Sequence, residues 1–181
     1  MKLECSNGSG FMAYHNTFSL DSKEMHEIYD LANEKNITLV FDIGRPGNNC
    51  YQVDNLAKIV REYPNITFVI CHLLAHQINQ LDLLKENLNK FKLPNVYFDL
   101  ASVINNTKPE TYPYPTASIY LREAINILGS DHLMWGTDMP SGICNDTYEH
   151  NIDWIMKNPL FTDNEKEDIF YNTANKVYFN E

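Results

Sequence analysis

Three residues whose side chains can bind metal ions or move protons stand at the ends of short apolar runs. Asp42 ends the run ITLVFD, His72 ends ITFVICH, and Asp138 follows LMWGT. Carboxylates and imidazoles act as general acids or bases and also ligate divalent ions. Arg45, in a Gly-Arg-Pro-Gly segment after Asp42, has a guanidinium that can clamp a carboxylate. These residue types suit the hydrolysis of a small anionic carbonyl or lactone compound.

Each side chain has a candidate role in that chemistry. Asp138 can take a proton from water, and His72 can polarise or protonate the substrate oxygen. A divalent metal held partly by Asp42, His72 and Asp138 would lower the pKa of bound water toward about 7. Arg45 would bind the negative charge of the substrate.

The same residues also have structural interpretations, which the sequence leaves open. Asp138, just before Met-Pro, can be a turn or capping carboxylate. His72 can be a hydrogen-bonded core histidine. Asp42 can pair with Arg45 across the loop. The residue types alone do not choose between these readings.

Three further features concern the surroundings of these residues. Asp99, in YFDLAS, is as compatible with a satisfied interior carboxylate as with a catalytic one. Among the other histidines, His76 is placed to approach the site after the second apolar run. The segment 105–118, rich in proline and tyrosine, is interpreted as an ordered surface loop, with a lid over a pocket as the alternative.

The apolar runs that carry these residues recur along the chain. They begin at residues 37, 66, 96 and 133, about every 30 residues, which is the length of a strand, a crossover helix and their loops. The intervening segments have a helical apolar period. The predicted helices cover residues 21–36, 52–64, 77–91, 117–129, 150–158 and 162–179. The first of them is predicted to open with an Asp21 cap and to bury Met25, Ile28, Tyr29 and Ala32.

Short, nearly continuous apolar strands joined by helices are typical of a parallel sheet covered on its faces. In such folds the chemistry lies at the carboxyl ends of the strands, in a closed barrel or an open sheet. The sequence thus predicts an α/β fold with Asp42, His72 and Asp138 at one edge of the sheet.

Composition limits the partners and the compartment. The chain has 181 residues and a formal charge of −10, without a basic cluster, so we expect no nucleic-acid partner. No apolar run reaches the roughly 18 residues of a membrane span, and the first residues do not resemble a signal peptide. The four cysteines form no C-x-x-C pair and are expected to be unpaired thiols of a cytoplasmic protein.

Several segments resemble one family in the order in which that family has them. Residues 129–140, GSDHLMWGTDMP, resemble the strand-eight signature of amidohydrolase-related proteins, in which the aspartate at the position of Asp138 ligates metal or transfers protons. Residues 63–74 resemble strand six, with His72 as the strand-end histidine. Residues 95–102 resemble strand seven, and residues 162–178 resemble the closing helix. The resemblance implies a metal-dependent hydrolase or decarboxylase built on a (β/α)₈ TIM barrel. It also implies one bound divalent metal, which in this family is often zinc.

Two departures from that family affect the expected site. The chain contains no His-x-His pair, which in the family supplies two metal ligands from the first strand. Many relatives have a metal-binding histidine on strand five, where this chain has Asp42. Counted back from strand eight, the runs are strands five to eight, with a strand near residues 2–14 as the fourth.

We therefore expect residues 1–181 to form a single amidohydrolase-related domain, a partial TIM barrel of about five strands. A complete barrel needs about 250 residues. The expected partners are a small-molecule substrate and either further copies of the chain or a missing N-terminal segment. The alternatives to a hydrolase are a non-oxidative decarboxylase of the same family, an assembly subunit, and a non-catalytic remnant.

Overall fold

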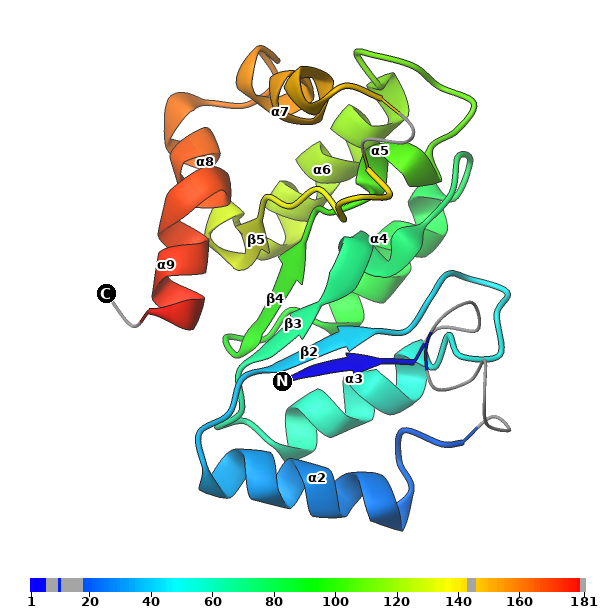
Figure 1. The fold of residues 1–181 in the computed structure, drawn as a ribbon, viewed down its shortest axis with the longest axis vertical. Helices are drawn as coiled ribbons and strands as arrows, with labels where there is room; N and C mark the ends of the chain where they lie inside the picture. Colours follow the sequence, from blue (N-terminus) through cyan, green and yellow to red (C-terminus); the bar gives the residue numbers. More distant parts are fainter. Residues whose placement is uncertain (6–9, 11–17, 143–145, 180–181) are drawn as a thin grey trace.

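Five short strands form one parallel sheet, and their order in space is their order in the chain (Figure 1). The structure, a computed structural model, describes residues 1–5, 10, 18–142 and 146–179. The strands are β1 (Lys2–Glu4), β2 (Leu39–Asp42), β3 (Phe68–Ile70), β4 (Val96–Asp99) and β5 (Leu133–Met134). Each predicted apolar run therefore contains a strand, and the strand expected within residues 2–14 is β1.

The strands are shorter than the apolar runs that predicted them. After β3, the residues of the run 66–74 leave the sheet and form a turn, η1 (Cys71–Ala75), in which four consecutive residues have positive φ. After β5, the Trp135 N–H donates to the Ile169 carbonyl at 2.8 Å, so the chain turns away from β4. Local apolar character predicts a buried segment but not where it leaves the sheet.

Helices separate the strands as predicted. They are α2 (Lys23–Glu34), α3 (Val53–Glu62), α4 (Leu81–Lys90), α5 (Val103–Asn106), α6 (Pro115–Leu128), α7 (Tyr148–Met156), α8 (Asp163–Glu167) and α9 (Thr173–Tyr178), with the turns η2 (Ser130–His132) and η3 (Asp168–Asn172). The prediction of an Asp21 cap is wrong, because the Ser22 side chain accepts the Met25 N–H while Asp21 pairs with Lys58. Thr162 caps the last helical segment and forms a capping box with Glu165.

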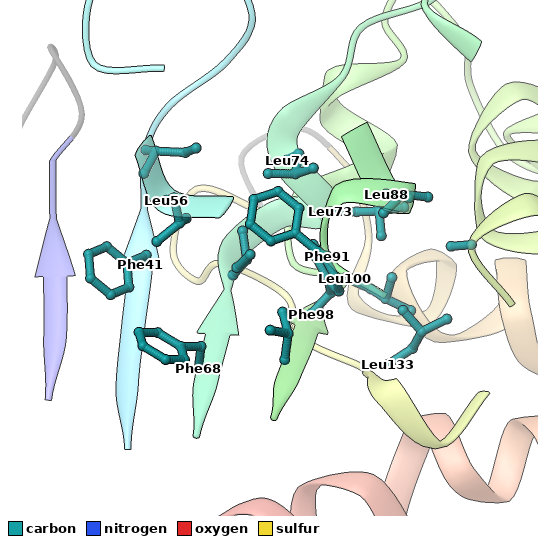
Figure 2. Close-up of a cluster of buried hydrophobic side chains, with 14 of the residues drawn as sticks. Phe41, Leu56, Phe68, Leu73, Leu74, Leu88, Phe91, Phe98, Leu100 and Leu133 are labelled. Atoms are coloured by element: carbon teal, nitrogen blue, oxygen red, sulfur yellow. The ribbon is translucent and has the colours of Figure 1, made fainter. Parts of the chain in front are cut away.

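The main core lies between the sheet and the helices α2, α3, α4 and α6. Alternate strand residues point into it. Figure 2 shows Phe41, Phe68 and Phe98 in this core, one from each of three neighbouring strands, together with Leu56 and Leu88. Met25, Tyr29 and Ala32 are buried on α2 as predicted, and Ile28 packs against the core partly buried. These contacts fix which face of each strand is turned away from the helices.

The opposite face of the sheet carries a smaller apolar cluster. Val69, Tyr97 and Met134 lie there, and Val177 of α9 packs on them. Figure 1 accordingly shows α9 on the other side of β4 from α4. In a (β/α)₈ barrel this face is the barrel interior, so the last helix covers part of the interior surface.

The segment after α5 is attached to α7. The Tyr112 ring stacks on His150 with ring centroids 4.3 Å apart, and the buried Tyr114 donates its hydroxyl to Asp146. Residues 107–114 thus form a connection held against α7. The predicted loop of residues 105–118 is shorter in the structure, because its two ends belong to α5 and α6.

Cys5, Cys50 and Cys71 are free thiols in the structure, as expected, and Cys144 lies outside the described residues. Within the described ranges, each helix is too short or too polar to cross a bilayer.

Candidate active site

The carboxyl ends of β2, β3 and β4 bring Asp42, His72 and Asp99 together. Phe41 and Phe98 both pair with Ile70 in the sheet, so the residues that follow them, Asp42 and Asp99, leave their strands at the same level. Both carboxylates belong to the face that is turned away from the helices, because their neighbours Phe41 and Phe98 point into the main core.

His72 is held between these strand ends by three contacts. Its Nδ1 lies 2.9 Å from the Ala101 carbonyl oxygen, and its Nε2 lies 3.3 Å from Asp42 Oδ2. Its backbone N–H donates to Asp99 Oδ1 at 2.8 Å. The side chains of His72 and Asp42 are only 13% and 12% exposed, so the pair is largely screened from water.

The pair is an ion pair over a wide pH range. Burial alone would lower the pKa of His72, but the hydrogen bond with Asp42 and the charges of Asp99 and Asp42 outweigh it and raise the pKa to about 9. Burial opposes ionisation of Asp42, but the hydrogen bonds from His72 and the Gly44 N–H lower its pKa to about 2. Asp42 is therefore paired with His72, and the alternative of an Asp42–Arg45 pair is wrong.

Asp138 and Arg45 lie on the loops that follow β5 and β2. Asp138 is exposed, has a φ of 56°, and accepts a 2.6 Å hydrogen bond from the Ser102 hydroxyl. Arg45 is exposed on the turn after Asp42, and its carbonyl accepts the Asn48 N–H. Across the described residues, its guanidinium makes no ion pair, which leaves it available to an anion.

The contacts at His72 suit a metal ligand. Ligating histidines usually donate their other ring N–H to a carbonyl or carboxylate, as Nδ1 can do here to Ala101. Nε2 then faces the Asp42 carboxylate, and this pairing is favourable only with a proton or another cation between the two. Asp42 and His72 therefore fit a divalent ion as two of the three or four ligands that zinc requires.

The predicted third ligand is not gathered at the same point. Over the described part of the chain, one group of at least three His, Cys, Asp or Glu residues has its ligand atoms within 4.8 Å of one another. That group is Asp21, His26 and Glu62, on the outside of α2 and α3, where Lys58 already pairs with Asp21 at 2.6 Å. Asp138 instead accepts the hydrogen bond from Ser102, and Ser102 lies on the same turn as the Ala101 carbonyl.

Other candidates from the sequence have different surroundings. His76 is 3% exposed and lies near Tyr51 and Asn87, where its Nε2 is 3.2 Å from the Asn87 amide. Asp99, for which the sequence left two readings open, contacts His72. His15 lies outside the described residues. Ser102 was not singled out from the sequence, because its role depends on a contact between two distant loops.

Comparison with known proteins identifies the family of the chain. The amidohydrolase family model matches residues 11–179. This chain belongs to the amidohydrolase family. No curated protein sequence matches the chain.

Solved structures of the same fold extend beyond the chain. An amidohydrolase from Burkholderia multivorans superposes with a TM-score of 0.75 at 14% identity, over 92% of this chain and 62% of that one. The same protein has also been solved with bound zinc. A probable 2-pyrone-4,6-dicarboxylic acid hydrolase from Acinetobacter baumannii has a TM-score of 0.73 at 16% identity, over 98% of this chain and 63% of that one.

A 5-carboxyvanillate decarboxylase from Sphingomonas paucimobilis has a TM-score of 0.63 at 14% identity, over 92% of this chain and 56% of that one. The chain therefore spans about three fifths of the length of these proteins. Its fold is a partial (β/α)₈ barrel, as predicted.

Proposed function

We propose that the chain carries part of the active site of a metal-dependent hydrolase that acts on a small anionic carbonyl or lactone compound. The observation that supports this most directly is His72, held with Asp42 and the Ala101 carbonyl at the carboxyl edge of the strands. Active sites of (β/α)₈ enzymes lie at this edge. The similar Acinetobacter baumannii protein is described as a probable 2-pyrone-4,6-dicarboxylic acid hydrolase, and 2-pyrone-4,6-dicarboxylic acid is a compound of the proposed class.

The proposed roles follow from the position of each side chain. Asp138 is exposed and oriented by the Ser102 hydroxyl, so it can take the proton from an attacking water. In its protonated form, His72 can donate a hydrogen bond or proton from Nε2 to the substrate oxygen as negative charge develops there. With a divalent ion bound at Nε2, the imidazole would be neutral and would hold the ion instead. Asp42 keeps the imidazole oriented and charged.

We propose Asp42, His72 and Asp138 as this chain's share of the metal ligands, with zinc as the first choice; Asp42 and His72 already lie together, and Asp138 would have to approach them when the ion binds. A divalent ion bound by them would supply Lewis acidity and an activated water. The Burkholderia multivorans protein, which is similar in fold, has been solved with bound zinc, and this supports a divalent ion as the cofactor.

Arg45 is the proposed group for substrate binding. It is exposed on the turn that follows Asp42, and a guanidinium binds a carboxylate through two parallel hydrogen bonds. The substrate would therefore carry a carboxylate next to the reacting carbonyl group.

The second candidate function is non-oxidative decarboxylation. It is supported by the likeness to the 5-carboxyvanillate decarboxylase. The same residues would then serve a different step: Arg45 would hold the anionic substrate, and His72 would donate a proton to the carbon that loses carbon dioxide.

The two functions are distinguished by assaying lactone dicarboxylates and carboxylated phenols, each with and without added zinc or manganese. Asp138→Asn and His72→Gln are expected to lower kcat by about 100-fold or more. Arg45→Ala should mainly raise KM. Asp131→Asn, an exposed aspartate before β5, is the control. The proposal would be excluded if the chain, together with whatever strands complete the barrel, turned over neither panel in a metal-stimulated way. Full activity of Asp138→Asn would also exclude it.

We also propose that further parallel strands complete the sheet, supplied by another copy of the chain or by a separate segment. Along its described residues, β1 pairs with β2 alone, so its outer edge has unpaired backbone groups. The chain also has no His-x-His pair, so the metal site needs ligands from elsewhere. Light scattering should show a defined oligomer or complex; a monodisperse monomer that binds zinc tightly would contradict the idea.

The remaining alternative is a non-catalytic remnant that keeps the site residues without activity. Stoichiometric zinc binding that is lost in Asp138→Ala would argue against it. Wild-type protein that binds zinc no better than Asp138→Ala would favour it over the enzyme.

A further inference from the structure

The turn after β4 contacts both His72 and Asp138. Asp99 Oδ1 accepts the backbone N–H of His72 at 2.8 Å and that of Ala101 at 3.1 Å. The Ala101 carbonyl lies 2.9 Å from His72 Nδ1. Ser102 donates its hydroxyl to Asp138 Oδ2 at 2.6 Å. Three residues of the segment 99–102 thus contact two loops that are distant in the sequence.

The contacts of this turn stabilise backbone conformations that His72, Ser102 and Asp138 do not favour by themselves. His72, Ser102 and Asp138 have φ values of 61°, 58° and 56°, in the left-handed region. That region is unfavourable for non-glycine residues, because it brings Cβ too close to the following carbonyl oxygen. Such conformations persist where surrounding contacts determine them. The hydrogen bonds of Asp99 and Ser102 are such contacts.

The packing of the turn against the end of β5 supports the same conclusion. Gly136, two residues before Asp138, lies directly beside Ala101. A Cβ at position 136 would be 3.2 Å from the Ala101 Cβ and 3.6 Å from its backbone nitrogen. The missing side chain lets the two segments approach closely enough for the Ser102–Asp138 hydrogen bond.

We infer that Asp99 and Ser102 are positioning residues, which orient His72 and Asp138 respectively. This inference rests on the proposed function, in which His72 and Asp138 contact the substrate or metal. Asp99 acts through its acceptor oxygen, because one oxygen receives N–H groups from two loops. Ser102 acts through its hydroxyl, which restricts the Asp138 carboxylate to one orientation.

The first test measures amide hydrogen exchange of the metal-free full chain by NMR. In Asp99→Ala, exchange at the His72 and Ala101 amides should rise about ten-fold or more, while the Phe98 amide of β4 stays unchanged. Asp99→Asn keeps an acceptor oxygen and should restore protection to within about three-fold of wild type. Unchanged exchange in Asp99→Ala, or equal loss in Asp99→Asn, would overturn the role of Asp99.

The second test concerns Ser102 and has a matched control elsewhere. Ser130, which precedes β5 in the chain, donates its hydroxyl to Asp168 Oδ2 at the same distance of 2.6 Å. In Ser102→Ala, exchange at the Gly142 amide, which donates to the Asp138 carbonyl, should rise about ten-fold. Ser130→Ala should leave it unchanged. An equal response to both substitutions would overturn the role of Ser102.

Zinc titration then connects positioning with the proposed site. Asp99→Ala and Ser102→Ala should each weaken zinc binding by about ten-fold or more, and Ser130→Ala should not. If the wild-type chain binds zinc and these variants bind it equally well, the positioning role is excluded. If the wild type binds no zinc, the metal part of the proposed function fails, while the exchange measurements still decide the inference.

Discussion

At the scale of single residues, the pair of Asp42 and His72 is the centre of the site. The imidazole is protonated and the carboxylate is ionised over most of the pH range, because the hydrogen bond and opposite charges of the two groups outweigh the burial that opposes both charges. A buried ion pair is not in itself a strong source of stability, but removing one partner leaves the other charged and unpaired. The pair is therefore sensitive to substitution.

Asp42→Asn in metal-free protein should lower the free energy of unfolding by about 2 kcal/mol at pH 6. The raised pKa of His72 gives stability that is fully present below about pH 6.5 and lost as pH rises through about 9. The cost of Asp42→Asn should therefore shrink between pH 6.5 and 10, as measured by urea unfolding. Asp82→Asn, at an exposed position of α4, should change stability by less than about 0.5 kcal/mol at every pH.

His76 gives the opposite pH dependence. Burial lowers its pKa to about 4, so the folded protein holds it neutral where the unfolded chain binds a proton. Stability should therefore fall by about 1.4 kcal/mol per pH unit as pH drops from 6.5 to 4, and His76→Gln should remove this slope. The side chain of His150 is 39% exposed, and His150→Gln is the control. If NMR gave a pKa near 6.5 for His76, the prediction would be contradicted.

At the scale of elements, the turn Cys71–Ala75 shows how tertiary contacts overcome a local preference. His72, Leu73, Leu74 and Ala75 all have positive φ, although none is glycine. Burial of Leu73 and Leu74 in the core and the Asp99 hydrogen bond keep them there.

The strain can be measured by comparing two alanine substitutions. Ala75 (φ 50°) and Ala57 of α3 are both buried, at 6% and 4% exposure. Ala57→Gly should destabilise the protein by about 1 kcal/mol or more, because glycine is unfavourable in a helix. Ala75→Gly relieves the left-handed strain and should cost about 1 kcal/mol less than Ala57→Gly. Equal destabilisation in thermal unfolding would show that the turn is not strained.

At the scale of the whole molecule, the chain has five of the eight strands of a barrel and covers part of its interior with α9. Val177 is 8% exposed and packs on the interior cluster of Val69, Tyr97 and Met134. The final helix therefore stabilises a sheet face that other strands cover in a complete barrel.

Val177→Asp should expose that face. We expect a loss of at least about 2 kcal/mol in the free energy of unfolding, since a carboxylate would be buried without a partner. The variant should also bind more of a hydrophobic dye than the wild-type protein does, because the apolar face is exposed. Tyr171→Asp, at a position 61% exposed in the same C-terminal segment, is the control. Equal stability of the two variants would mean that α9 does not cover the interior.

The sequence by itself determined the order of strands and helices and the edge of the sheet at which the polar residues lie. Both follow from apolar periodicity and from the geometry of parallel sheets, which are local properties repeated along the chain. It also indicated the family, because the residues around Asp138 form a contiguous motif.

Only the tertiary structure decided which side chains meet. The pairing of His72 with Asp42, the acceptor role of Asp99 and the bond from Ser102 to Asp138 each join residues about 30 positions apart. They depend on strand register and on backbone conformations that the residue types do not favour locally. Sequence periodicity contains no information on such contacts, because they arise when separate loops are brought to one edge of the sheet.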